Sequence, residues 1–269
     1  MKKNKHNFLQ KQFLRKVMMM VPVICFFAIT SVFAQDNGYM DDQSSVTVQA
    51  QEAPPALPDY VQPECPGDGY IWTPGYWNWV SDGYYWVPGV WVLPPSIGLL
   101  WTPGYWGFYN SFYGWHPGYW GAQVGYYGGI NYGFGYFGTG FFGGRWEGSH
   151  FMYNTSVWRV GRNIHNTYVN KVTINNNNRN RASFNGNGGV RYRPNNNEMK
   201  VTNVTRTPAS KEQIGHEQNM RNEKGQFHNT NPKPAVHSMS APGGQRFDER
   251  GRATGGTRGG GGGDRRGRG

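Results

Sequence analysis

The sequence has few cysteines and few aliphatic residues. Cys25 and Cys65 are its two cysteines among 269 residues, and so low a number excludes a scaffold held together by disulfide bonds. Gly (40) and Pro (17) together exceed a fifth of the chain, and the second half is rich in Asn and Arg. This composition favours a small ordered core with long disordered flanks over two packed domains.

Positive charge is missing from a long central stretch. Residues 35–144 contain no Lys or Arg and eight acidic residues, whereas residues 145–269 contain 21 Lys and Arg against eight acids, a net charge of +13. An acidic block followed by a basic one is typical of a chain with an interaction tail. We expect the basic tail either to meet anionic surface polymers or to act only as a solubilising tail.

Long apolar runs are also rare, and the longest lies at the N-terminus. Six Lys and Arg fall within the first 16 residues, an apolar run follows from Val17 to Phe33, and Val32-Phe33-Ala34 precedes Gln35. This pattern predicts a secretory signal helix over residues 1–34 that is cleaved after Ala34, which leaves Cys65 as the one thiol. An uncleaved anchor helix is the alternative, because the run reaches the minimum length for spanning a bilayer. We therefore expect export to the periplasm, the outer membrane or the exterior.

A tandem repeat occupies the centre of the chain. Its four units are WTPGYW from Trp72 to Trp77, WVPGVW from Trp86 to Trp91, WTPGYW from Trp101 to Trp106, and WHPGYW from Trp115 to Trp120. The first tryptophans of the four units follow one another at nearly constant intervals, and the second tryptophans follow at the same intervals. Two series in step indicate a true internal repeat.

Each unit contains a turn signal. Proline restricts φ to the negative value that suits the second position of a turn, and glycine tolerates the positive φ that the next position of a type II turn requires. Thr73-Pro74-Gly75-Tyr76 is therefore predicted as a turn. A second signal, Ser81-Asp82-Gly83, lies between units and leaves room for strands of three to five residues.

The pairing of the strands is left open by these signals. Type II turns splay paired strands, so the Pro-Gly corners can also be sharp bends between strands that pair elsewhere. The predicted fold is mostly β, a small meander or stacked β-repeat of short strands.

These units resemble the WXXGXW (YXWGXW) repeat family of exported bacterial proteins. The resemblance extends upstream to Cys65-Pro66-Gly67-Asp68-Gly69-Tyr70 and downstream to Tyr126–Gly133, Phe184-Asn185-Gly186 and Arg193-Pro194. It spans roughly residues 65–215 and implies export, a repeat scaffold and no enzymatic activity.

The flanks divide by composition. Residues 35–66 are predicted to be a flexible acidic leader, 67–121 the repeat region, and 122–158 a Gly/aromatic region whose strands stack on the repeats or self-associate. Residues 159–207 are expected to hold little structure beyond a strand over 168–174. Residues 208–269 are expected to be a disordered basic tail with a short helix from Thr207-Pro208 to about Asn222.

The aromatic residues are the candidate functional groups. Residues 70–120 hold nine Trp, eight Tyr and two Phe against one charged side chain, Asp82. Most single tryptophans are expected in the core, but a thin sheet cannot hide so many rings, so we predict an exposed stripe that binds saccharide or a second copy. The predicted binding array is Trp72, Trp77, Trp86, Trp91, Trp101, Trp106, Trp115 and Trp120.

Signals for catalysis and cofactors are weak. The histidines show no ligand spacing with Cys or acids, and the carboxylates are scattered through polar segments, so we predict no enzymatic activity, no cofactor and no metal. An Arg/Gly-rich end beyond Arg246 is also typical of nucleic-acid binding, which export argues against. A membrane-associated assembly protein is the remaining alternative.

Overall fold

The computed structural model describes residues 45–173, 181–201 and 205–254, all of which belong to one compact unit, Met40–Gly269. The predicted signal helix (1–34), residues 35–44 of the predicted acidic leader and residues 255–269 of the Arg/Gly-rich end lie outside the described residues. Within the described ranges, no helix has the length and apolar character needed to cross a membrane.

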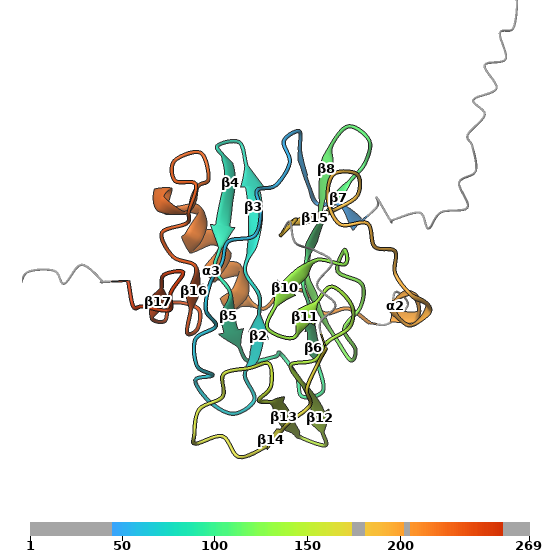
Figure 1. The fold of residues 1–269 in the computed structure, drawn as a ribbon, viewed down its shortest axis with the longest axis vertical. Coiled ribbons are helices and arrows are strands. Elements are labelled where there is room, and N and C mark those ends of the chain that lie inside the picture. The colour runs from blue at the N-terminus through green and yellow to red at the C-terminus, as the bar shows by residue number, and fades with distance from the viewer. Residues whose placement is uncertain (1–44, 174–180, 202–204, 255–269) are drawn as a thin grey trace, which may run out of the picture. The chain divides into compact units, whose positions relative to one another are not determined.

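The first two repeat units form one interrupted hairpin, here called hairpin A. It contains β2 (Ile71–Thr73), β3 (Tyr76–Val80), β4 (Gly83–Val87) and β5 (Val90–Val92). β3 pairs antiparallel with β4, and β2 pairs antiparallel with β5. The chain therefore reverses once, at Ser81-Asp82, and the outgoing and returning halves are each broken by a Pro-Gly corner (Figure 1).

The third and fourth units repeat this arrangement as hairpin B, in which Trp101 takes the place of Trp72. Its strands are β6 (Leu100–Thr102), β7 (Tyr105–Phe108), β8 (Tyr113–His116) and β9 (Tyr119–Gly121). β7 pairs with β8 and β6 with β9. Two added strands widen the β7–β8 part into a four-stranded sheet, because β1 (Val48–Ala50) pairs with β8 and β15 (Phe184–Asn185) with β7.

The prediction that the Pro-Gly corners are type II turns is wrong, whereas the Ser81-Asp82-Gly83 turn is confirmed. Positive φ occurs at Gly83 (114°) at the tip of hairpin A but at none of the four repeat glycines. The Pro-Gly corners are instead sharp bends, as the alternative prediction had it. The strands on either side of each bend pair with strands of the other unit in the same hairpin. Proline lacks an N–H, so the ladder is interrupted there in both strands.

The Gly/aromatic region contributes short strands next to the hairpins. β10 (Asn131–Gly133) pairs with β11 (Tyr136–Phe137). β12 (Gly144–Glu147), β13 (His150–Asn154) and β14 (Thr167–Tyr168) form a separate three-stranded sheet. The strand predicted over 168–174 is reduced to β14, which ends at Tyr168, and Ile174 lies outside the described residues.

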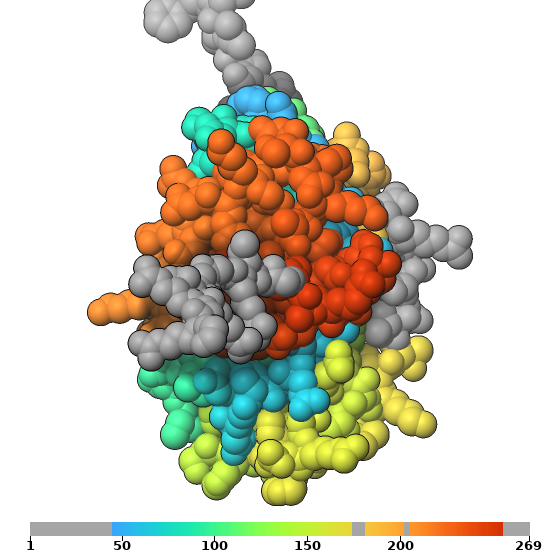
Figure 2. Space-filling view, turned by 90° about the vertical axis from the view of Figure 1, so that its left-hand side faces the viewer, coloured from blue at the N-terminus to red at the C-terminus, as the bar shows by residue number. Residues whose placement is uncertain are grey.

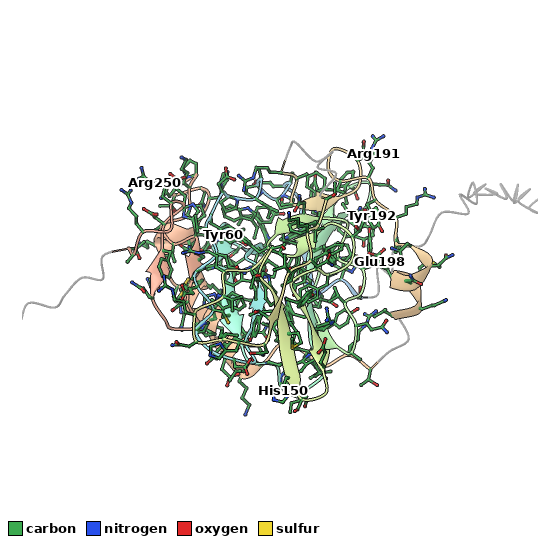
Figure 3. The ribbon with its side chains drawn as sticks, turned by 60° about the horizontal axis from the view of Figure 1, so that its bottom comes forward. Tyr60, His150, Arg191, Tyr192, Glu198 and Arg250 are labelled. Atoms are coloured by element: carbon green, nitrogen blue, oxygen red, sulfur yellow. The ribbon has the colours of Figure 1, made fainter. Side chains whose placement is uncertain are left out.

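Two helices follow. α2 (Asn196–Lys200) begins at a capping box made by Asn195 and Glu198, and Tyr192 also donates a hydrogen bond to Glu198 (2.8 Å; Figure 3). α3 (Lys211–Arg221) is the helix expected near Thr207-Pro208, but its N-cap is Ser210, where a second capping box with Gln213 supplies the missing acceptors.

The C-terminal segment beyond α3 is folded rather than disordered as far as it is described. It forms the 3-10 turn η3 (Lys224–Gln226) and the pair β16 (Ser238–Met239) and β17 (Arg246–Phe247). In Figure 2 these residues and α3, coloured orange and red, make up much of the face that is shown. The leader is likewise ordered from Ser45 onward, with Leu57 and Cys65 buried. Both segments cover hairpin surface that would otherwise be apolar and exposed.

The fold class is confirmed. The described chain is mostly β, built from short strands in small sheets around a core in which Trp and Tyr take the place of aliphatic residues.

Candidate functional site

All eight tryptophans of the predicted array are buried. The most accessible, Trp101, exposes 7% of its surface, and Trp72, Trp86, Trp91 and Trp120 expose none. The expected exposed tryptophan stripe is therefore absent from the described residues. The sheet is not thin and open as assumed, because leader and C-terminal segments cover its faces.

The tryptophans pack as cross-strand pairs. In hairpin A, Trp72 meets Trp91 edge-to-face with ring centroids 5.4 Å apart, and Trp77 meets Trp86 at 5.3 Å. The equivalent pairs of hairpin B are Trp101–Trp120 at 5.2 Å and Trp106–Trp115 at 5.5 Å. Such ring pairs contribute about 0.5–1.5 kcal/mol each beyond the burial of their area. Each repeat unit therefore finds its partner in the neighbouring unit.

The repeat glycines are required by these rings. A Cβ on Gly75 would lie 2.3 Å from Cζ2 of Trp86 and 2.8 Å from the backbone nitrogen of Gly89. A Cβ on Gly89 would lie 2.5 Å from Cζ2 of Trp72. Gly104 and Gly118 face Trp115 and Trp101 in the same way. The spacing Trp-x-x-Gly-x-Trp thus encodes a reciprocal contact, in which the first tryptophan of one unit covers the glycine of the other.

The indole N–H groups join the hairpins to distant segments. Trp77 donates to the Ala56 carbonyl (3.1 Å) and Trp91 to that of Pro63 (2.9 Å), both in the leader. Trp86 donates to the His237 carbonyl (2.9 Å) in the C-terminal segment. A buried indole N–H needs an acceptor, so these bonds explain why both flanks are ordered.

Tyr136 ties the two hairpins together. Its hydroxyl lies 3.1 Å from the Trp101 carbonyl and 3.3 Å from the Trp72 carbonyl, which are equivalent positions of hairpins B and A. Trp106 adds a direct bond by donating to the Trp77 carbonyl (2.8 Å). Burial raises the pKa of Tyr136 well above its usual value, so the hydroxyl keeps its proton for this contact.

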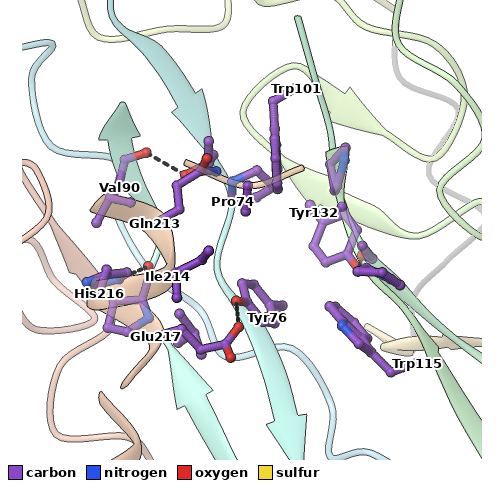
Figure 4. A pocket seen from close by; sticks show the side chains of 18 residues that line it. Pro74, Tyr76, Val90, Trp101, Trp115, Tyr132, Gln213, Ile214, His216 and Glu217 are labelled. Atoms are coloured by element: carbon purple, nitrogen blue, oxygen red, sulfur yellow. Dashed lines mark hydrogen bonds between the residues drawn. The ribbon is translucent and has the colours of Figure 1, made fainter. Parts of the chain in front are cut away.

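The four Pro-Gly corners meet at one cavity of about 90 Å³, here called the corner cleft (Figure 4). Its walls come from both hairpins, from Tyr132 and from one side of α3. The lining includes Pro74, Pro88, Pro103, Pro117, Tyr76, Trp101, Trp115, Gln213, Ile214, His216 and Glu217. Tyr76 and Trp115 stack there with centroids 5.0 Å apart. Ile214 is 47% exposed, so an aliphatic side chain from α3 stands at a cleft with mainly apolar walls.

Polar groups of the cleft are engaged with one another. The Tyr76 hydroxyl donates to Glu217 (2.5 Å), and burial followed by the Glu217 charge raises the pKa of Tyr76. Nε2 of His216 donates to the Pro88 carbonyl (2.9 Å), and burial lowers the pKa of His216, which favours its neutral form. Gln213 accepts from the Trp120 indole (2.8 Å). These contacts fix α3 against both hairpins.

One family comparison bears on this arrangement. The WXXGXW repeat family matches residues 67–92 in two copies, a range that contains the whole of hairpin A. The chain is a WXXGXW repeat-containing protein. Comparison with curated proteins and with solved structures gives no match.

Hairpin B lies outside the matched range but reproduces the WXXGXW contacts position by position, with Trp101, Gly104, Trp115 and Gly118 in the places of Trp72, Gly75, Trp86 and Gly89. The sequence identified all four units from their spacing. It missed the part played by α3, because Gln213, His216 and Glu217 are far along the chain from the units they contact. The local signals in that segment, Thr207-Pro208 and the Ser210 capping box, indicate a helix but not the surface on which it packs.

The corner cleft suits a small apolar group. Among the described residues, no group of three or more His, Cys, Asp or Glu is placed to hold a metal ion. A hydrocarbon-lined cavity of about 150 Å³ accepts benzene, so about 90 Å³ is room for part of a side chain or ring edge. The volume and the apolar walls of the corner cleft therefore suit an apolar side chain of another molecule that packs against the protein surface.

Proposed function

We propose that this WXXGXW repeat-containing protein is an exported, non-enzymatic structural and adhesive protein of the cell envelope or the extracellular space. Its repeats form a rigid frame, and its surface contacts saccharide or a second copy of the chain. The N-terminal pattern of positive residues, apolar run and Ala34 supports export.

The observation that carries the proposal is the use of the repeat tryptophans. Buried pairs, reciprocal glycine contacts and indole bonds to both flanks make them a frame. Contact with other molecules is then left to exposed groups that the frame holds at its surface, such as Ile214 at the corner cleft.

Two experiments test location and adhesion. Fractionation of native cells with an antibody to the protein should find it in the envelope or the medium. Mature protein should then be retained by at least one of a set of purified wall polymers and surface glycans. A cytosolic protein, or one that no polymer retains and that stays monomeric at high concentration, contradicts the proposal.

Self-association through the corner cleft has its own variant pair. Ile214→Glu places a charge at the cleft, whereas Ile97→Glu places one on an equally apolar side chain, 65% exposed, that does not line it. If copies meet at the cleft, sedimentation should show weaker association for I214E and wild-type behaviour for I97E. Equal behaviour of the two variants removes the cleft as the contact. Substitution of the repeat tryptophans cannot test this contact, because these side chains are buried and their loss would disrupt the core.

A further inference from the structure

A second hollow is lined in part by Gly75 and Trp86 of hairpin A. We call it the Tyr60 groove, after the leader tyrosine that lines it and is labelled in Figure 3. Its volume is about 330 Å³, within the range of about 300–1,000 Å³ that is usual for small-molecule sites. Leader residues, the β10–β11 hairpin, hairpin A and Arg181 all contribute to it.

Aromatic rings form its walls. Tyr60 packs against Phe134 with ring centroids 5.1 Å apart and against Trp86 at 6.0 Å. Tyr60, Phe134 and Phe137 are only half-buried, whereas Trp86 is fully buried beneath them. The groove thus offers ring surface to a ligand although the repeat tryptophans do not.

The Tyr60 hydroxyl is already engaged. It accepts a hydrogen bond from the Gly75 N–H (3.3 Å), and burial raises the pKa of Tyr60, so the phenol stays neutral. Tyr60 therefore serves as a fixed flat surface.

Polar groups for a ligand come from the rim. Asp59 and Arg181 form an ion pair there, with side-chain exposures of 87% and 36%. The carboxylate offers acceptors and the guanidinium offers donors, and together they carry no net charge. A rim of this kind suits a neutral ligand whose groups both donate and accept, and it gives no preference to an anion.

Backbone strain is concentrated at this groove. The described chain has three non-glycine residues with positive φ: Asn110, Phe134 (46°) and Arg181 (48°). Asn adopts this conformation readily, but Phe and Arg rarely do. Both of these line the Tyr60 groove. Strained residues are retained where the surrounding structure holds them for a purpose, and ligand sites are the commonest such place.

We propose that the Tyr60 groove binds one ring of a neutral, β-linked hexopyranose chain. Such a ring has an apolar face of axial C–H groups that fits against Tyr60, Phe134 or Phe137, and a rim of equatorial hydroxyls that both donate and accept. This inference rests on the proposed adhesive function, because it assigns the saccharide contact to a place.

Calorimetric titration of the full mature protein with cellohexaose and chitohexaose tests the assignment. Phe137→Ala removes a ring from the groove and also breaks the stack of Phe137 on Phe142, whose centroids are 6.0 Å apart. Phe142→Ala breaks the same stack from the side that does not line the groove. We expect at least one sugar to bind, affinity to fall about ten-fold or more in F137A, and F142A to stay within two-fold of wild type.

A second pair of variants tests the groove without removing a packed ring. Arg181→Gln removes the donor fork and charge at the rim, and Arg145→Gln does so at an arginine outside the groove that is also paired with an acid, Glu147. R181Q should weaken sugar binding and R145Q should not. Both variants should unfold at the same temperature as the wild type. This pair decides the matter if F137A does not fold.

The outcomes separate the two proposals. Sugar binding that F137A and R181Q leave unchanged overturns the groove and leaves adhesion standing. Absence of hexasaccharide binding, together with retention on a wall polymer, also overturns the groove alone, as does binding restricted to acidic glycans. Failure of every polymer and sugar to bind overturns the saccharide contact in both.

Discussion

At the scale of single residues, the repeat is a set of reciprocal contacts in which a tryptophan ring packs on the backbone of a glycine that has no side chain. Gly75 lies where any Cβ would meet the Trp86 ring at 2.3 Å. The requirement is for space and not for backbone freedom, since the repeat glycines have no positive φ.

Gly75→Ala should lower the free energy of unfolding by about 3 kcal/mol, because the methyl group forces Trp86 and Gly89 apart in a packed core. Gly215→Ala is the matched control: it lies inside α3 with open space around its Cβ and should stabilise the protein by up to about 1 kcal/mol. Urea unfolding measures both. A G75A protein as stable as wild type would show that the motif glycine has another role.

The Cys65 thiol should be inert in the folded protein. Burial raises its pKa to about 11, and its Sγ donates to the Gly67 carbonyl (3.1 Å). Since the thiolate is the reactive form, alkylation by iodoacetamide at pH 8 should be slow until denaturant is added. Rapid labelling of native protein, followed by mass spectrometry, would contradict the burial of this side chain.

At the scale of elements, the hairpins depend on hydroxyl and indole bonds that cross between them. Tyr136→Phe removes one hydroxyl that contacts both the Trp72 and the Trp101 carbonyls, and should cost about 1–3 kcal/mol because buried acceptors are left without a partner. Tyr127→Phe is the control, since its equally buried hydroxyl donates to the single Gly140 carbonyl (2.7 Å). The thermal unfolding midpoint of Y136F should lie below that of Y127F. The reverse order would show that the Tyr136 hydroxyl does not hold the two hairpins together.

The elements also show what the sequence could supply. The in-step tryptophans, the Ser81-Asp82-Gly83 turn and the predominance of short strands were predictable, because each rests on residues close together in the chain. The pairing of units, the ordered flanks and the corner cleft were not. They depend on bonds such as Trp86 to His237, 151 residues apart, which no local pattern encodes.

At the scale of the whole molecule, buried histidines make stability depend on pH. Burial lowers the pKa of both His216 and His237, and Nδ1 of each has no hydrogen-bond partner among the described residues. The unfolded chain therefore takes up protons below about pH 6.5 that the native chain does not. The free energy of unfolding should fall as pH falls from 7 to 5, by at most about 1.4 kcal/mol per pH unit for each histidine.

Urea titrations at several pH values measure this slope. His216→Gln retains a donor for the Pro88 carbonyl but cannot be protonated, so it should flatten the slope. His150→Gln should not, because His150 is exposed. A slope that is the same in all three proteins, or stability that rises toward pH 5, contradicts the prediction.

The reciprocal contact within each hairpin has a consequence for how such chains can change in length. One unit alone is half of a hairpin: without Trp86 and Gly89, the ring of Trp72 and the backbone of Gly75 have nothing to meet. Loss or gain of a single unit leaves one unit without a partner, whereas addition of a whole hairpin adds a complete pair. Chains built on this pattern should therefore carry their units in even numbers.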